Sequence, residues 1–132
     1  MVSTRRNGVF CLTVSDDFQI RKENVVKFDV ESGLLISDNI EDLCTDNEGR
    51  VWMGSQEGYV FLYNQKSKTV EDYSDVFTTL TEGVQDMMMD KTGHLWISTN
   101  KRIIEYDPKT GGQNKLSGRT GSYVVNSLTK HL

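Results

Sequence analysis

The chain has 132 residues, a length that suits one ordinary domain better than two independent cores. Lysine and arginine total 15 against 19 aspartates and glutamates, and neither sign gathers in a long block, which argues against a nucleic-acid partner. No apolar stretch approaches the ~18 residues that a membrane helix needs, and the opening MVSTRRNG lacks the apolar core of a secretory signal. We therefore expect no membrane contact by this segment.

The first 34 residues predict a degenerate or partial structural unit. In the later units described below, a tryptophan follows an aspartate and a glycine, and this signature is missing from residues 1–24. Phe18 is the candidate replacement for the tryptophan, ten residues before Phe28. Phe28 itself precedes Ile40 much as Tyr73 precedes Val84, so this segment resembles the closing part of a unit.

Two full units follow, at residues 35–78 and 79–120, and each divides into four strand-like pieces separated by turn residues. In the first unit the expected strands are 40–45, 50–55, 59–64 and 69–74; in the second they are 84–89, 94–99, 102–107 and 113–117. Residues 121–132 are expected to supply the first strand of a further unit. A helix over TTLTEGVQDMMMDK is the competing interpretation, but Gly83 interrupts it and the equivalent ISDNIEDLCTDN is a poorer helix.

Identical or similar residues recur in the two units at a separation of 44 positions. Asp and Gly recur in the first turn of each unit, where the aspartate side chain can accept backbone N–H bonds and glycine tolerates a positive φ. A tryptophan and a small residue then recur in the second strand. The matched pairs are Ile40 and Val84, Asp42 and Asp86, Asp46 and Asp90, Gly49 and Gly93, Trp52 and Trp96, and Ser55 and Thr99.

Strands such as VFLY, RIIEY and MMM do not alternate between apolar and polar residues, which predicts sheets that are buried on both faces. Four-stranded sheets stacked around an axis meet that condition, so the predicted fold class is all-β: β-propeller blades, in an incomplete propeller fragment of about three blades. Trp52 and Trp96 would fill the gaps between blades, and Ser55 and Thr99 would be small enough to let a neighbour approach.

The repeated pattern resembles the two-component regulator propeller repeat. In the first unit it comprises Ile40, Asp42, Leu43, Asp46, Gly49, Val51, Trp52, Met53, Gly54, Ser55, Tyr63 and Asn64; in the second it comprises Val84, Asp86, Met87, Asp90, Gly93, Leu95, Trp96, Ile97, Ser98, Thr99, Tyr106 and Asp107. Ser98 replaces the usual glycine. The resemblance covers about residues 25–132.

Such repeats form the sensor region of hybrid histidine kinase/response regulators in gut Bacteroidetes. The resemblance implies a periplasmic, ligand-sensing segment of a two-component system sensor, which often responds to a poly- or oligosaccharide. The kinase and DNA-binding parts would lie elsewhere in a longer chain. The segment would be non-catalytic by itself and would need no cofactor.

A ligand is expected at the propeller face that carries the inter-blade crossings and the turn between the second and third strands. Its polar or aromatic residues could stack on a sugar or form hydrogen bonds to it. The ligand-binding candidates are Gln56, Phe77, Asn100, Arg102, Arg119 and Tyr123.

Other residues that could carry chemistry have simpler interpretations, and no metal site is predicted. His94 is a turn residue and His131 lies near a terminus, while the three methionines at 87–89 are interpreted as strand core. Asp42 and Asp86 could be paired catalytic carboxylates, but their recurrence at the repeat period indicates a structural duty. Cys11 and Cys44 have no CxxC partner and are expected to be buried thiols.

Two other functions compete with ligand sensing. The turns DNEGRVW and DKTGHLW are similar to the Asp-box of sialidase propellers, but a sialidase needs a converging set of arginines and a tyrosine nucleophile, and Arg102 and Arg119 fall short of that set. A purely structural module is the other alternative, because incomplete rings leave apolar sheet faces and strand edges that favour self-association.

Overall fold

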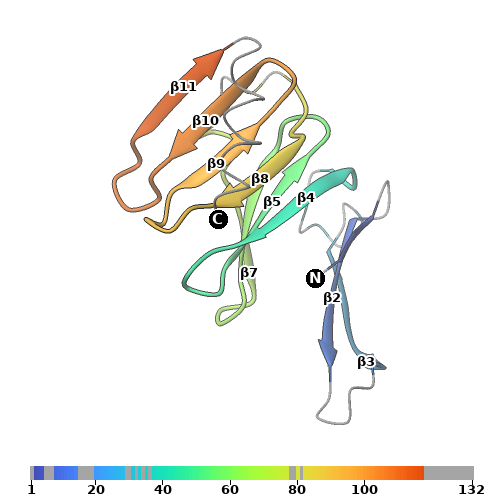
Figure 1. Ribbon diagram of the computed structural model, residues 1–132. Coiled ribbons are helices and arrows are strands. Elements are labelled where there is room, and N and C mark those ends of the chain that lie inside the picture. Colours follow the sequence, from blue (N-terminus) through green and yellow to red (C-terminus); the bar gives the residue numbers. More distant parts are fainter. Residues whose placement is uncertain are drawn as a thin grey trace.

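The computed structural model describes residues 2–4, 8–14, 20–28, 31, 33, 35, 37–77, 80 and 82–117. Every regular element in these ranges is a strand (Figure 1). The strands are β1 (Val2–Thr4), β2 (Gly8–Val14), β3 (Ile20–Phe28), β4 (Ile40–Thr45), β5 (Val51–Ser55), β6 (Val60–Asn64), β7 (Thr69–Asp72), β8 (Asp86–Met89), β9 (Leu95–Ser98), β10 (Arg102–Tyr106) and β11 (Gln113–Ser117). No helix in the described part is long and apolar enough to span a bilayer.

The strands form three antiparallel sheets, and each sheet is built from strands that follow one another in the sequence. One four-stranded sheet has the order β4-β5-β6-β7, the next has the order β8-β9-β10-β11, and β1, β2 and β3 form a three-stranded sheet. The eight strands predicted for the two full units are confirmed to within two residues at each end. The segment after Gly83 enters strand β8, so the helical interpretation is wrong.

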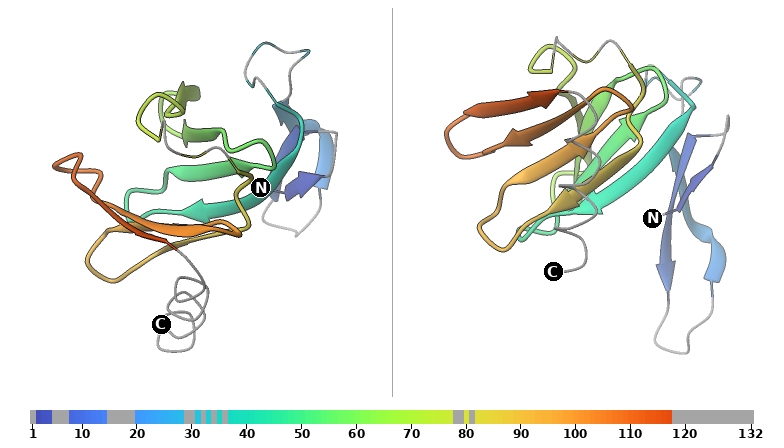
Figure 2. Two further views of the ribbon diagram at one scale, coloured as in Figure 1. Left: turned by 90° about the horizontal axis from the view of Figure 1, so that it is seen from above. Right: turned by 45° about the horizontal axis from the view of Figure 1, so that its top comes forward.

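The two four-stranded sheets stack face against face, as the view from above shows (Figure 2). Their first strands, β4 and β8, contact each other, and β1 of the three-stranded sheet contacts β4. The first strands of the two four-stranded sheets therefore lie together along one side of the stack, which is the arrangement of the innermost strands in a propeller. The predicted fold class, propeller blades in an incomplete ring, is confirmed.

Two apolar cores hold the stack together. The first lies between the two four-stranded sheets and has Trp52 at its centre, fully buried, with the rings of Tyr73 and Tyr106 edge-on at centroid distances of 4.9 and 6.1 Å. The second joins the three-stranded sheet to β4–β7 and includes the rings of Phe28 and Tyr63, whose centroids are 4.7 Å apart. Sheet β4–β7 is thus apolar on both faces, as its sequence predicts.

Trp96 does not lie between the two described four-stranded sheets, as Trp52 does. It is on the opposite face of sheet β8–β11 and is only half-buried. The difference has a simple cause, because equivalent residues of successive blades face the same way around the ring, and Trp96 faces away from the blade before it. The prediction that Trp96 fills an inter-blade gap stays a prediction, as does self-association.

The first turn of each full unit has the predicted structure. The Oδ1 atom of Asp46 accepts the backbone N–H groups of Glu48 and Arg50, both at 2.9 Å, and Oδ1 of Asp90 accepts those of Thr92 and His94, also at 2.9 Å. The glycines that follow, at positions 49 and 93, have φ values of 77° and 86°. Since only glycine adopts this region without strain, the Asp-x-x-Gly pattern fixes the hairpin.

The described N-terminal sheet agrees with the closing part of a unit. Phe28, at the end of β3, pairs with Val9 of β2, much as the N–H of Tyr73, after β7, donates to the oxygen of Val60 of β6 at 2.8 Å. Phe18, the side chain of Cys11 and the further strand expected at 121–132 lie outside the described residues. Cys44 packs against the first core, and burial raises the pKa of its thiol to about 11.

Candidate recognition face

The β5–β6 turn, the β9–β10 turn and the crossover from β7 to β8 meet at one end of the stack, as predicted. A Cβ atom built on Gly58 would lie 2.8 Å from the backbone oxygen of Glu82, and one on Gly83 would collide with the backbone oxygen of Gln56. The N–H of Val84 donates to the oxygen of Ser55 at 2.9 Å. The crossover is therefore fastened directly onto the preceding blade's turn, and two glycines allow that approach.

Ser55 and Thr99 organise the turns at this end. The hydroxyl of Ser55 accepts the N–H of Tyr59 at 2.9 Å, and the hydroxyl of Thr99 accepts the N–H groups of Lys101 and Arg102, both at 3.1 Å. Thr99 also donates to the Glu82 carboxylate at 2.7 Å. Besides the small size predicted from the sequence, these two residues thus have hydroxyl groups that close the turns.

Three of the candidate ligand residues lie at this face. Gln56 and Asn100 are exposed, and the Gln56 amide donates to Glu41 at 2.8 Å. Arg102 is half-buried, and its Nε atom lies 2.7 Å from the Glu82 carboxylate. Arg102 is thus held in place by an ion pair, which leaves Gln56 and Asn100 as the candidates with exposed polar groups.

The other three candidates are placed differently. The ring of Phe77 is 1% exposed and packs edge-on against Tyr106 at a centroid distance of 5.0 Å, so it has no open face on which a sugar could stack. An aromatic residue in a polar crossover indicated a ligand contact, but the crossover folds the ring back into the core. Arg119 and Tyr123 lie outside the described residues.

A carboxylate that the sequence pattern does not single out is also held by hydrogen bonds at this end. Glu57, in the β5–β6 turn, accepts hydrogen bonds from the Ser37 hydroxyl at 2.7 Å and from the Asn39 amide at 2.5 Å. Burial opposes its charge, but these hydrogen bonds outweigh that effect and lower the pKa of Glu57 below its ordinary value. The Glu57 carboxylate and the amides of Asn39 and Gln56 thus lie at the same end of the stack.

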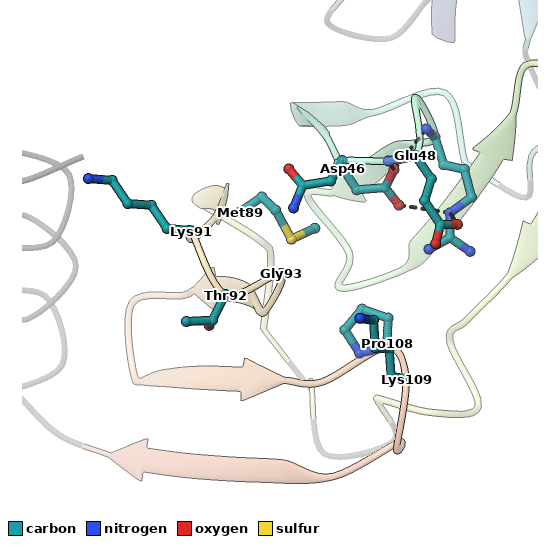
Figure 3. A pocket seen from close by; sticks show the side chains of 10 residues that line it. Asp46, Glu48, Met89, Lys91, Thr92, Gly93, Pro108 and Lys109 are labelled. Atoms are coloured by element: carbon teal, nitrogen blue, oxygen red, sulfur yellow. Dashed lines mark hydrogen bonds and ion pairs between the residues drawn. The ribbon is translucent and has the colours of Figure 1, made fainter.

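A cavity of about 310 Å³ lies at the opposite end, between the first turns of the two full units (Figure 3). Charged and polar side chains from both turns line it, together with residues from the β10–β11 turn. Arg50 is tied to Asp46 here by an ion pair of 2.8 Å. The lining residues are Asp46, Asn47, Glu48, Arg50, Met89, Lys91, Thr92, Gly93, Pro108 and Lys109.

Asp42 and Asp86 meet where the innermost strands β4 and β8 are in contact. Oδ2 of Asp42 accepts the backbone N–H of Met87 at 2.8 Å, so this carboxyl links one blade to the next. Burial and then a hydrogen bond with the Asp86 carboxyl raise the pKa of Asp42 to about 6. Asp42 therefore takes up a proton at a higher pH than an exposed aspartate does.

Replacing Asp42 with asparagine is expected to stabilise the fold at pH 8 by about 1 kcal/mol, because the amide can donate to Asp86 without taking up a proton. Asp42 has a pKa of ~3.9 in an unfolded chain and about 6 in the fold. The folded state binds this proton more tightly, so the stability it contributes is present below the unfolded value and is lost as pH rises through about 6.

Urea unfolding of both proteins at several pH values between 4 and 8 measures this effect. Asp42→Asn should flatten the dependence on pH, whereas the control Asp75→Asn, at an exposed carboxyl in the crossover, should leave it unchanged. Parallel pH profiles for Asp42→Asn and the unmodified chain would contradict the raised pKa of Asp42.

Comparison with known proteins identifies the repeat. The family profile described as two component regulator propeller matches residues 34–57. Residues 34–57 are thus similar to a two component regulator propeller repeat. The matched residues include Asp42, whose carboxyl links β4 to β8. They also include Asp46 and Gly49, which form the first turn, and Trp52. No curated protein sequence matches the chain.

Two solved structures share the fold of this propeller segment. Both are described as the extracellular domain of BT4673 from B. thetaiotaomicron, assigned to a one component system in one and to a hybrid two component system in the other. They are 21% and 20% identical to the chain, with a TM-score of 0.67 in each case. The alignments cover 88% and 89% of this chain but 16% of each solved chain. The segment therefore spans about a sixth of their length.

The described residues of the propeller segment do not assemble the arginine set that a sialidase requires. Arg50 is paired with Asp46 at one end, and Arg102 is paired with Glu82 at the other. The Oδ1 atoms of Asp46 and Asp90 accept backbone hydrogen bonds within their own turns. The resemblance to an Asp-box is thus explained by the turn itself.

Proposed function

We propose that the chain is part of the ligand-sensing propeller of a two-component sensor, and that its ligand is an oligosaccharide held at the face formed by the β5–β6 turn, the β9–β10 turn and the crossover. The observation that carries the proposal is the row of exposed or half-buried polar groups fastened there to rigid strands. Sugar hydroxyls both donate and accept, and this face carries the amides of Gln56 and Asn100 and the carboxylate of Glu57.

A periplasmic or extracellular position of the parent protein fits this function. Both solved structures that share the fold are extracellular domains of signalling systems. A propeller outside the cytoplasm could bind a saccharide and bias the arrangement of its blades. Transmission of that change would need other parts of a sensor.

The proposal predicts that a panel of neutral oligosaccharides contains at least one that raises the unfolding temperature of the 132-residue chain and binds it in calorimetry. Gln56→Ala and Asn100→Ala should each weaken that binding about fivefold, the effect of losing one hydrogen bond. Lys66→Ala, in the β6–β7 turn at the opposite end, is the matched control and should leave affinity unchanged. Equal losses in all three variants, or no binding across the panel, would contradict the proposal.

A further inference from the structure

A histidine and two carboxylates converge at the start of β9, on the face of sheet β8–β11 that carries Trp96. Nδ1 of His94 lies 3.2 Å from Oε2 of Glu105. The possible ligand atoms of Asp90, His94 and Glu105 all lie within 4.8 Å of one another. Ligand atoms bound to one tetrahedral Zn²⁺ lie roughly 3.4 Å apart, as bond lengths of about 2.0–2.2 Å require. Small side-chain rotations would therefore close the three groups around one ion.

Each carboxylate has one oxygen fixed by a donor from a neighbouring element. Oδ2 of Asp90 accepts the indole N–H of Trp96 at 2.8 Å, which leaves a second lone pair on that oxygen. Oε1 of Glu105 accepts the amide of Asn114 at 2.9 Å, which leaves Oε2 facing the imidazole. Hydrogen bonds of this kind hold metal ligands in position.

The second nitrogen of the imidazole also has a carboxylate beside it. Nε2 of His94 lies 3.6 Å from Oδ2 of Asp107. Asp107 is itself fixed, because its Oδ1 accepts the backbone N–H of Lys109 at 2.9 Å. A carboxylate on the far nitrogen orients the ring and places the lone pair on the other nitrogen, which is the usual support of a metal-binding histidine.

The cluster borders a cavity that leaves coordination positions open. This cavity has a volume of about 270 Å³, and its lining includes His94, Glu105, Asp107 and Gln113. The Oε1 atom of Gln113 is buried and has no hydrogen-bond partner in the described structure. A hydrated cation in the cavity would give this acceptor a water donor.

From this geometry we propose that Asp90, His94 and Glu105 bind a divalent transition-metal cation of the Zn²⁺ type. The imidazole nitrogen favours Zn²⁺ over Ca²⁺ or Mg²⁺, which prefer oxygen ligands alone. Three protein ligands leave at least one position for water or for a ligand donor group. The site would brace the β8–β9 turn against β10.

The first unit shows that the propeller repeat does not require this set. Asp46 is equivalent to Asp90, but Arg50 stands in the place of His94 and Leu62 in that of Glu105. Leu62 is buried in the core between the two four-stranded sheets, and Arg50 binds Asp46 directly. The histidine and the second carboxylate are thus specific to the second unit.

The test is titration of the 132-residue chain with Zn²⁺ in competition with a chromogenic chelator. One ion per chain is expected. His94→Gln and Glu105→Gln should each weaken binding at least ~100-fold, and Asp107→Asn, which removes only a positioning group, should weaken it ~10-fold. Glu71→Gln, at an exposed carboxylate of β7, is the control and should bind as the unmodified chain does.

Tryptophan fluorescence gives a second readout, because Trp96 donates to a proposed ligand while Trp52 lies in the core. Zn²⁺ should change the emission of the unmodified chain but not that of Trp96→Phe. Circular dichroism checks that each variant is folded. Unchanged Zn²⁺ affinity in folded His94→Gln or Glu105→Gln, displacement of Zn²⁺ by equal Ca²⁺, or no saturable binding up to ~1 mM Zn²⁺ would overturn the site.

Discussion

Replacing Trp52 with alanine is expected to lower the free energy of unfolding by about 4 kcal/mol, the upper range for a buried aromatic residue. Its indole is fully buried between the two four-stranded sheets and contacts Tyr73 and Tyr106 edge-on. Its N–H has no hydrogen-bond partner in the described part of the chain, so the loss arises from packing and not from a broken hydrogen bond. Urea unfolding followed by far-UV circular dichroism measures the difference.

Trp96→Ala is the matched control, since the residue occupies the same position in the next unit. It is only half-buried, and its loss removes one hydrogen bond to Asp90 and part of an apolar contact. A decrease of about 2 kcal/mol is expected. Equal losses for the two variants would show that the stacked sheets are not the main source of stability, and would contradict the central role of Trp52.

The local features of the fold could be predicted from the sequence, because each is encoded within a few residues. Asp46 and Gly49 form their hairpin through hydrogen bonds and a φ value that depend only on the turn itself. The repeat at 44 residues then extends that prediction to Asp90 and Gly93 without any knowledge of the packing. The strand bounds follow from these turns.

Features that depend on register or on the path of a crossover could not be predicted. His94 was interpreted as a turn residue, because Glu105 reaches it only through the pairing of β9 with β10, in which Glu105 stands opposite Trp96. Phe77 was assigned to the ligand face, because the crossover's return into the core leaves no periodic signal. The equivalent aspartates of the two units also have different side-chain partners. Asp46 binds the side chain of Arg50, and Asp90 binds the side chain of Trp96.

Gly54→Ser is expected to lower the free energy of unfolding by about 3 kcal/mol, through crowding of the core and burial of a hydroxyl. Gly54 faces the next blade, and a Cβ atom there would lie 2.6 Å from Cγ1 of Val84 and 2.8 Å from Sδ of Met87. Both distances are shorter than a van der Waals contact, so the sheets would have to move apart. Denaturant unfolding measures the loss.

The equivalent position in the second unit carries Ser98 instead of glycine. Ser98 lies on the face of β9 that carries Trp96, turned away from the core that contains Val84 and Met87. Ser98→Gly leaves that core unchanged and should change stability by less than about 1 kcal/mol. Comparing the two substitutions distinguishes two contributions to the loss of stability. One is the crowding of adjacent blades at Gly54, and the other is the general cost of changing a strand residue. Losses of equal size would mean that Gly54 is not needed for the approach of Val84.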